Sequence, residues 1–168
     1  LPLLVNAVDL ISGEEVVFEQ GSVAEAVQAS CAIPGIFTPV KRDERLLVDG
    51  GLLDNLPAAL MKERKLDYII AVDVAAQKPL QKEPGNIFDV LIQSYDIIRR
   101  HRDKPAYDYA DQLIEPDLSD VSMWDVQKAD DIIDKGYQAA KEVLSGVDFD
   151  SKRGRIAQWL DRRRIKRR

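Results

Sequence analysis

The stretch from Tyr68 to Ala75 is almost entirely apolar. A run of this length and composition is typical of a β-strand that is covered on both faces. Two further runs, Leu3–Leu10 and Leu46–Val48, are also strand-like, whereas apolar residues recur at helical spacing over 87–103 and from Val126 to Leu144. Strand-like runs that alternate with helical patterns predict an α/β fold, in which helices flank a sheet.

Turn and capping signals mark the ends of several elements. Ser12-Gly13 lies between Leu3–Leu10 and Val16–Phe18, and this arrangement predicts a β-hairpin. Ser22 and Glu25 have the spacing of a capping box, so a helix should begin at Ser22 and end by Pro34-Gly35. We also expect an extended segment over 36–40, a charged turn over 41–45, a helix over 57–65, a short strand over 113–114, and a helix that Asp125 caps and Gly146 ends.

The net charge of −5 hides a strong asymmetry. Residues 151–168 hold nine Lys or Arg and one acid, which makes this segment +8 and leaves −13 on residues 1–150. An acidic body argues against general nucleic-acid binding. The basic tail, which also carries Trp159 and Leu160, fits peripheral contact with an anionic membrane or a solvated tail equally well.

Cysteine and histidine are each present once. Cys31 cannot form an internal disulfide, and because free cysteines usually pack as small apolar residues, we expect it in the core. His101 lies among charged residues at a helix end, where we expect it to be solvated. We predict no metal and no cofactor. With no signal-peptide pattern and no run of roughly 20 apolar residues, we expect a cytoplasmic or membrane-associated protein.

Asp49-Gly50-Gly51 is the most informative site in the sequence. The strand-like run Leu46–Val48 ends at this carboxylate, at the kind of sheet edge where catalytic groups gather in α/β proteins. The two glycines would allow positive φ angles and a close approach of other groups. A carboxylate placed there can accept a proton from a serine hydroxyl. Taken alone, such a tripeptide is more often a tight surface turn than a catalytic site.

Two motifs in order give this turn a context. They are Ala29-Ser30-Cys31-Ala32-Ile33-Pro34-Gly35-Ile36-Phe37-Thr38-Pro39-Val40 and Leu47-Val48-Asp49-Gly50-Gly51-Leu52-Leu53-Asp54-Asn55-Leu56-Pro57. Together they resemble the patatin-like phospholipase family, densely over residues 22–75. The resemblance implies a Ser–Asp dyad in which Asp49 is the proton acceptor and Gly50 and Gly51 form the supporting turn. It also implies hydrolysis of carboxylic esters or phospholipids in lipid metabolism, with a lipid or acyl ester as substrate.

The chain departs from the family pattern at the nucleophile. None of its eight serines has glycine at both −2 and +2, so Gly-x-Ser-x-Gly is absent, as is a Gly-rich oxyanion loop. We therefore expect residues 1–150 to be the C-terminal part of a patatin-like hydrolase domain, without the half that carries the nucleophile, and 151–168 to be a basic tail. Such a chain should be inactive alone. A non-catalytic binding or interaction module remains the alternative, and the oligomeric state is open.

Several other residues have structural explanations that we prefer. We expect Asp73 to make structural hydrogen bonds, Asp54 and Asn55 to cap the following helix, and Ser30 to pack within its helix. The aromatic residues Tyr107, Tyr109 and Trp124 fit ordinary packing better than a lipid-binding groove.

Overall fold

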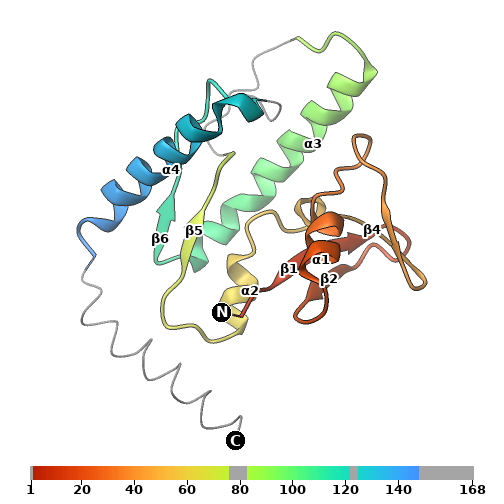
Figure 1. Ribbon diagram of the computed structural model, residues 1–168, viewed down its shortest axis with the longest axis horizontal. Coiled ribbons are helices and arrows are strands. Elements are labelled where there is room, and N and C mark those ends of the chain that lie inside the picture. The colour runs from red at the N-terminus through yellow and green to blue at the C-terminus, as the bar shows by residue number, and fades with distance from the viewer. Residues whose placement is uncertain (1, 76–82, 122–124, 148–168) are drawn as a thin grey trace, which may run out of the picture. The chain divides into compact units, whose positions relative to one another are not determined.

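The computed structural model describes residues 2–75, 83–121 and 125–147 (Figure 1). It divides into two compact units, one formed by Leu1–Pro57 with Leu80–Ala106 and the other by Ala58–Pro79 with Tyr107–Arg168. Both contain strands and helices, which confirms the predicted α/β class. No helix in the described ranges is long and apolar enough to cross a membrane.

A four-stranded antiparallel sheet forms the centre of the first unit. Its strands are β1 (Val5–Asp9), β2 (Glu15–Phe18), β3 (Val40–Arg42) and β4 (Arg45–Asp49), in the order β2-β1-β4-β3. The β1–β2 pair is the predicted hairpin. The β3–β4 pair is a second hairpin, whose turn at Asp43-Glu44 is tighter than the expected charged turn over 41–45. The expected extended segment over 36–40 becomes a strand only at Val40.

Helix α1 (Val23–Ser30) packs against β1 and β4. The Ser22 hydroxyl caps it by accepting a hydrogen bond from the Glu25 N–H at 3.4 Å, as the sequence predicts. The fully buried core beneath the helix consists of Ala7, Ala29 and Leu47. Small residues on the helix and on β1 allow the two backbones to approach closely. Cys31, however, follows the end of the helix and is exposed, so the expectation of a core cysteine was wrong.

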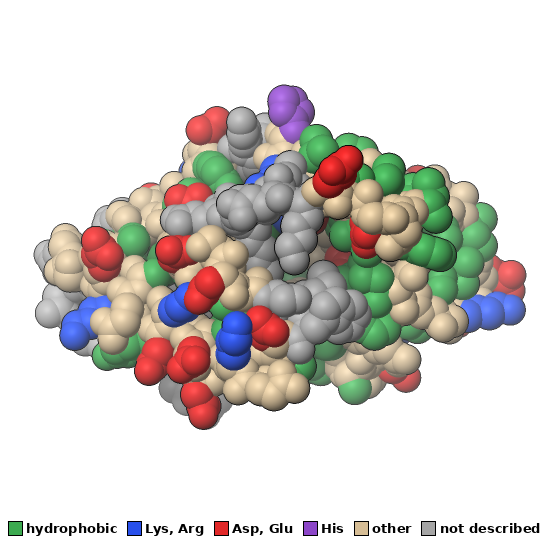
Figure 2. All heavy atoms as spheres, turned by 90° about the horizontal axis from the view of Figure 1, so that it is seen from above, with side chains coloured by type: hydrophobic (Ala, Val, Ile, Leu, Met, Phe, Trp, Pro, Cys, Tyr) green, Lys and Arg blue, Asp and Glu red, His purple; other side chains and the backbone are tan. Residues whose placement is uncertain are grey.

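Helix α3 (Ile87–Asp103) and the 3₁₀ helix η1 (Gly50–Leu52) complete the first unit. The helix lies where helical spacing predicts it, but its apolar stripe, with Ile87, Leu91 and Ile98, is exposed. Exposed hydrophobic side chains gather over one side of the face that Figure 2 shows. The buried residue on α3 is Arg99, of which 7% is exposed. The helix therefore turns a polar face toward its own unit.

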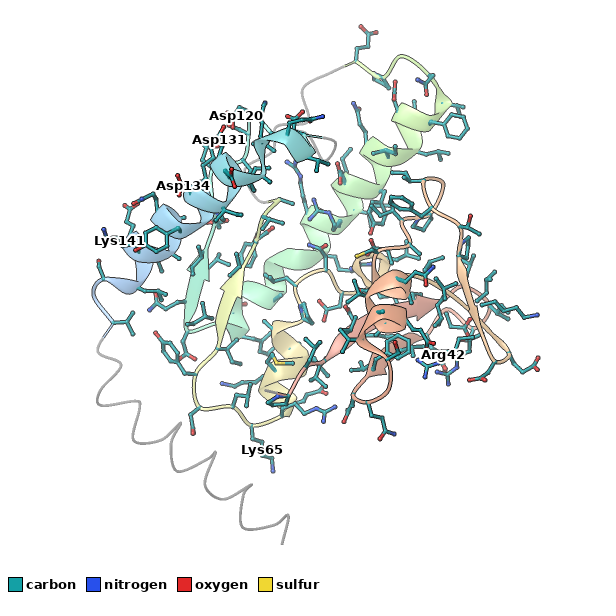
Figure 3. All side chains as sticks on the ribbon, viewed as in Figure 1. Arg42, Lys65, Asp120, Asp131, Asp134 and Lys141 are labelled. Carbon is teal, nitrogen blue, oxygen red and sulfur yellow. The ribbon has the colours of Figure 1, made fainter. Side chains whose placement is uncertain are left out.

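The second unit is built on a two-stranded parallel sheet. Its elements are α2 (Ala58–Glu63), β5 (Ile70–Val72), β6 (Gln112–Ile114), η3 (Val126–Lys128) and α4 (Ala129–Leu144), preceded by η2 (Lys104–Tyr109), where the chain enters the unit. Helix α4 packs against β6, and Asp131, Asp134 and Lys141 mark its polar, exposed side (Figure 3). The Asp125 side chain does not cap this helix as expected, since it pairs with Lys128 instead.

The strand expected over 68–75 is shorter and less covered than predicted. Only Ile70–Val72 forms β5, and Ile70 and Val72 are 41% and 48% exposed, while Ala71 and Asp73 are buried. The expectation of a strand covered on both faces was therefore wrong in the described chain. A two-stranded sheet packed on one side covers alternate side chains only. The basic tail, residues 151–168, lies outside the described residues.

The Asp9 side chain connects the end of β1 with the β1–β2 turn and with β4. Its Oδ1 accepts hydrogen bonds from the N–H groups of Ile11 and Leu46, at 3.2 and 3.1 Å, and its Oδ2 accepts one from the Ser12 hydroxyl at 3.0 Å. Burial raises the pKa of Asp9, but these hydrogen bonds outweigh it and leave the pKa below its ordinary value. The carboxylate thus ties the β1–β2 turn to the start of β4.

Asp9→Ala should destabilise the intact protein more than Asp9→Asn, because the amide oxygen of Asn can still accept from the two backbone N–H groups. The folded-state pKa is lowered, so the stabilisation by Asp9 is present above the unfolded-state pKa and is lost as the pH falls through the folded-state value. Melting temperatures from pH 7 downward test this. Equal melting temperatures for Asp9→Ala and the unchanged protein at pH 7 would contradict it.

Candidate active site

Asp49 lies at the point where β4 ends and η1 begins. The apolar residues Leu47 and Val48 of this strand are buried. Asp49 follows them, and its backbone leaves the strand with φ −47° and ψ 128°. The Asp49 Oδ1 accepts a hydrogen bond from the Gly51 N–H at 2.7 Å, which makes Asp49 the N-cap of η1. The carboxylate is half-buried and is held by the turn that follows it.

The two glycines after Asp49 allow other groups to come close to the backbone, and neither has a positive φ angle. The positive-φ glycines in the described chain are Gly13, Gly21 and Gly35, so the expectation of φ > 0 at Gly50 and Gly51 was wrong. A Cβ atom on Gly50 would lie 2.6 Å from both the backbone oxygen and the Oδ1 of Asn6. The expected close approach is confirmed, and the group that approaches is β1 of the same sheet.

Three side-chain oxygens surround Gly51. A Cβ atom at that residue would lie 2.9 Å from Asp49 Oδ1, 3.0 Å from Asn55 Oδ1 and 3.1 Å from the Tyr95 hydroxyl. All three oxygens are therefore within 3.1 Å of one point. The missing side chain at Gly51 leaves room for a polar cluster around the carboxylate.

The two sequence motifs meet at Asp49. Its backbone N–H donates to the Ala32 carbonyl at 3.0 Å, and Ala32 belongs to the segment that follows α1. The side-chain amide of Asn6 donates to the Asp54 carbonyl at 2.7 Å, which also holds the chain after η1 against β1. The two motifs thus lie together in one unit.

Helix α3 contributes residues that the sequence analysis missed. Tyr95, Arg99 and Arg102 follow at intervals of four and three, and therefore share one side of the helix. The guanidinium of Arg102 donates to the Gly51 carbonyl at 2.8 Å and to the Leu52 carbonyl. The available signal was polar residues at helical spacing beside an apolar stripe, but the sequence did not show what this polar face contacts.

The electrostatics of the cluster favour a proton acceptor. Burial raises the pKa of Asp49, while the hydrogen bond from Gly51 and the charge of Arg99 lower it, and the net result is a raised pKa. Burial, together with the negative charge of Asp49, raises the pKa of Tyr95 to about 12, so its hydroxyl stays protonated at neutral pH. A carboxylate with a raised pKa is a stronger base than an ordinary aspartate.

One oxygen of the carboxylate remains available. Within the described part of the chain, Oδ1 accepts the hydrogen bond from Gly51, and no hydrogen bond to Oδ2 is present. An anchored Oδ1 and an unbonded Oδ2 suit a group that is held in position while it accepts a proton.

The remaining predicted residues lie elsewhere. His101 is exposed. Asp73 is buried in the second unit, where it accepts hydrogen bonds from the Tyr107 hydroxyl at 2.7 Å and the Ala75 N–H at 2.9 Å, so its structural role is confirmed. Tyr109 is 43% exposed. Trp124 lies outside the described residues, and the capping role of Asp54 and Asn55 stays a prediction.

The first unit also has an open hollow away from Asp49. Residues from β2 and from the β3–β4 hairpin line it, and Arg42 lies over the ring of Phe18 with 5.0 Å between the guanidinium carbon and the ring centroid (Figure 3). Asp49 is not among the residues that line it.

Comparison with known proteins finds similarity in the part of the chain that contains Asp49. Residues 3–62, which include both motifs and the whole four-stranded sheet, match the patatin-like phospholipase family. Over these residues the chain is similar to this family. The match covers the Asp49 turn and the strands that hold it, whereas α3 lies beyond the matched residues.

Proteins similar to this chain occur in bacteria and fungi. An uncharacterized NTE family protein of Mycobacterium tuberculosis is 29% identical over 160 residues, which cover 81% of this chain and 27% of the relative. A second such protein of the same organism is 43% identical over 74 residues, 44% of this chain and 21% of the relative. Lysophospholipase NTE1 of Debaryomyces hansenii is 28% identical over 188 residues, 96% of this chain and 12% of the relative. The chain thus spans about a quarter or less of these relatives.

Gly50→Ala should destabilise the intact protein by about 1–3 kcal/mol, because the new methyl group overlaps the backbone oxygen of Asn6. Gly136→Ala is the matched control. Gly136 is in α4 with open space around its Cβ position, so alanine there should stabilise by about 0.5–1 kcal/mol. Chemical denaturation of both variants measures the difference. A Gly50→Ala protein as stable as the unchanged one would contradict the close approach.

Proposed function

We propose that the intact protein is a serine esterase that hydrolyses acyl esters of lipids, and that Asp49 is the proton acceptor of a Ser–Asp dyad. The carboxylate itself is the observation that carries this proposal: it is half-buried, anchored through Oδ1, unbonded at Oδ2 within the described chain, and raised in pKa. The family match supports the class of reaction. The serine would come from outside these 168 residues, since none of the chain's serines lies in Gly-x-Ser-x-Gly.

The reaction follows from the position of Oδ2. As the serine oxygen attacks the ester carbonyl, Oδ2 accepts the serine proton and Oδ1 keeps its hydrogen bond to the Gly51 N–H. The protonated carboxyl then donates that proton to the leaving alkoxide, which departs as an alcohol. Water repeats the sequence on the acyl-enzyme, releases the fatty acid and restores the serine. Arg99 stabilises the ionised form of Asp49 that begins each half-reaction.

A phospholipid or lysophospholipid is the substrate class that we propose. The Debaryomyces hansenii relative is named a lysophospholipase. The exposed apolar side of α3 is compatible with a lipid substrate but does not identify one. Contact of residues 151–168 with an anionic membrane, and a cytoplasmic or membrane-associated location, stay predictions.

Asp49→Asn should lower kcat/KM of the intact protein for p-nitrophenyl butyrate by about 10²–10⁴-fold, because the amide cannot accept the serine proton. The Asn oxygen can still accept from the Gly51 N–H, so the turn should persist. The raised folded-state pKa means that ionised Asp49 opposes folding above its unfolded-state pKa, and the variant should therefore melt at the same or a higher temperature at pH 7.

Equal rates for the two proteins would show that Asp49 is only a turn residue. If neither protein cleaves esters of several chain lengths, the non-catalytic binding module becomes the better interpretation. The intact sequence separates the two functions before any assay: a Gly-x-Ser-x-Gly favours the esterase, and its absence favours the binding module.

The acid limb of the kcat/KM profile should lie above the pH at which an ordinary aspartate titrates. Only ionised Asp49 accepts a proton, and its raised pKa moves the loss of activity to higher pH. Measurement of kcat/KM from pH 3 to pH 8 tests this. A limb at or below the ordinary aspartate pKa of 3.8 would contradict the assignment of the base.

A further inference from the structure

The last carbonyls of η1 are bound by a side chain from a distant part of the sequence. A three-residue 3₁₀ helix leaves its C-terminal carbonyls without partners inside the helix. The Gly50 carbonyl accepts from the N–H groups of Leu53 and Asp54, at 3.0 and 2.9 Å. The next two carbonyls, of Gly51 and Leu52, accept from the two terminal nitrogens of Arg102.

Gly51 is consequently held by hydrogen bonds at both its N–H and its carbonyl. Its N–H donates to Asp49 Oδ1 at 2.7 Å, and its carbonyl accepts from Arg102 at 2.8 Å. Rotation of the peptide units around Gly51 would disturb both hydrogen bonds. Glycine has the greatest backbone freedom of any residue, so this point of the turn would gain most from an external constraint.

We propose that Arg102 is a positioning residue for Asp49, and that its guanidinium fixes the Gly51–Leu52 turn so that the Gly51 N–H keeps Oδ1 in place and Oδ2 turned toward the serine. This inference rests on the proposed function for its catalytic consequence. The structural consequence, an ordered Gly51 N–H, does not depend on that function.

Simultaneous hydrogen bonds to the Gly51 and Leu52 carbonyls require arginine. The planar guanidinium reaches two successive carbonyls at once, whereas the ammonium of lysine is a single compact charge. The Nε of Arg102 is buried without a hydrogen-bond partner among the residues that the structure describes. Burial of an unpaired donor opposes folding, so the contacts of the two terminal nitrogens must offset it.

Arg99 has a different part in the same cluster. Its charge acts on Asp49 and Tyr95 through space, and it pairs with Asp96 at 3.5 Å. The charge that acts on Asp49 comes from Arg99, whereas Tyr95 is acted on by Asp49 and by Arg99, Arg102 and Asp96 of α3. Loss of the Gly51 hydrogen bond would remove an influence that lowers the pKa of Asp49.

The test uses the intact protein and the variants Arg102→Ala and Arg102→Lys. The matched control is His101→Ala, the neighbouring exposed position on α3. For p-nitrophenyl butyrate, we expect Arg102→Ala to lower kcat by about 10–100-fold, with KM changed less than about threefold, because a small displacement of a catalytic group is costly. The acid limb should move to higher pH. Arg102→Lys should fall between Arg102→Ala and the unchanged protein.

Hydrogen exchange of the peptide that spans residues 49–54 gives a readout without turnover. The Gly51 N–H should exchange faster in both Arg102 variants than in His101→Ala. If Arg102→Ala does not fold, the test uses Arg102→Lys, which keeps the charge. An unchanged exchange rate with unchanged kcat would overturn the proposal. If the unchanged protein hydrolyses no ester, the proposed function fails, and exchange alone decides: faster exchange supports positioning by Arg102, and unchanged exchange overturns it.

Discussion

The close contact between Gly50 and Asn6 is the constraint on which the candidate site depends. No side chain fits between η1 and β1, since a Cβ atom on Gly50 would lie 2.6 Å from the Asn6 backbone oxygen. Asn6 then uses its side-chain amide to hold the Asp54 carbonyl. The chain after β4 is thereby pressed against the sheet that delivers Asp49. The direction of the carboxylate follows from backbone packing before any charge is considered.

The polar inner face of α3 has an electrostatic explanation. Burial of an arginine such as Arg99 removes it from water at considerable cost, which only nearby negative charge and hydrogen-bond acceptors offset. Asp96, which pairs with Arg99, and Asp49 supply the charge, and the carbonyls of η1 supply acceptors for Arg102. A helix that only completed a core would bury its apolar stripe. Here the stripe is exposed in the described chain, and the polar face serves the carboxylate.

Local features of the sequence predicted the parts of the fold that depend on neighbouring residues. The β1–β2 hairpin, the Ser22 cap and the position of Asp49 at the end of β4 all follow from patterns a few residues long. A close approach at the glycines after Asp49 was predicted, but the group that approaches Gly50 was not, because it is 44 residues away in β1. Arg102 was missed for the same reason, since its partners lie about 50 residues earlier.

Two carboxylates at the ends of paired strands differ in their hydrogen bonds and in the direction of their pKa shifts. Asp9 ends β1 and accepts three hydrogen bonds, which lower its pKa despite burial. Asp49 ends β4, the neighbouring antiparallel strand, and accepts one, so burial prevails and its pKa is raised. A fully bonded carboxylate stabilises the fold but has no oxygen left for a proton. An under-bonded one costs stability and keeps an oxygen that can accept a proton.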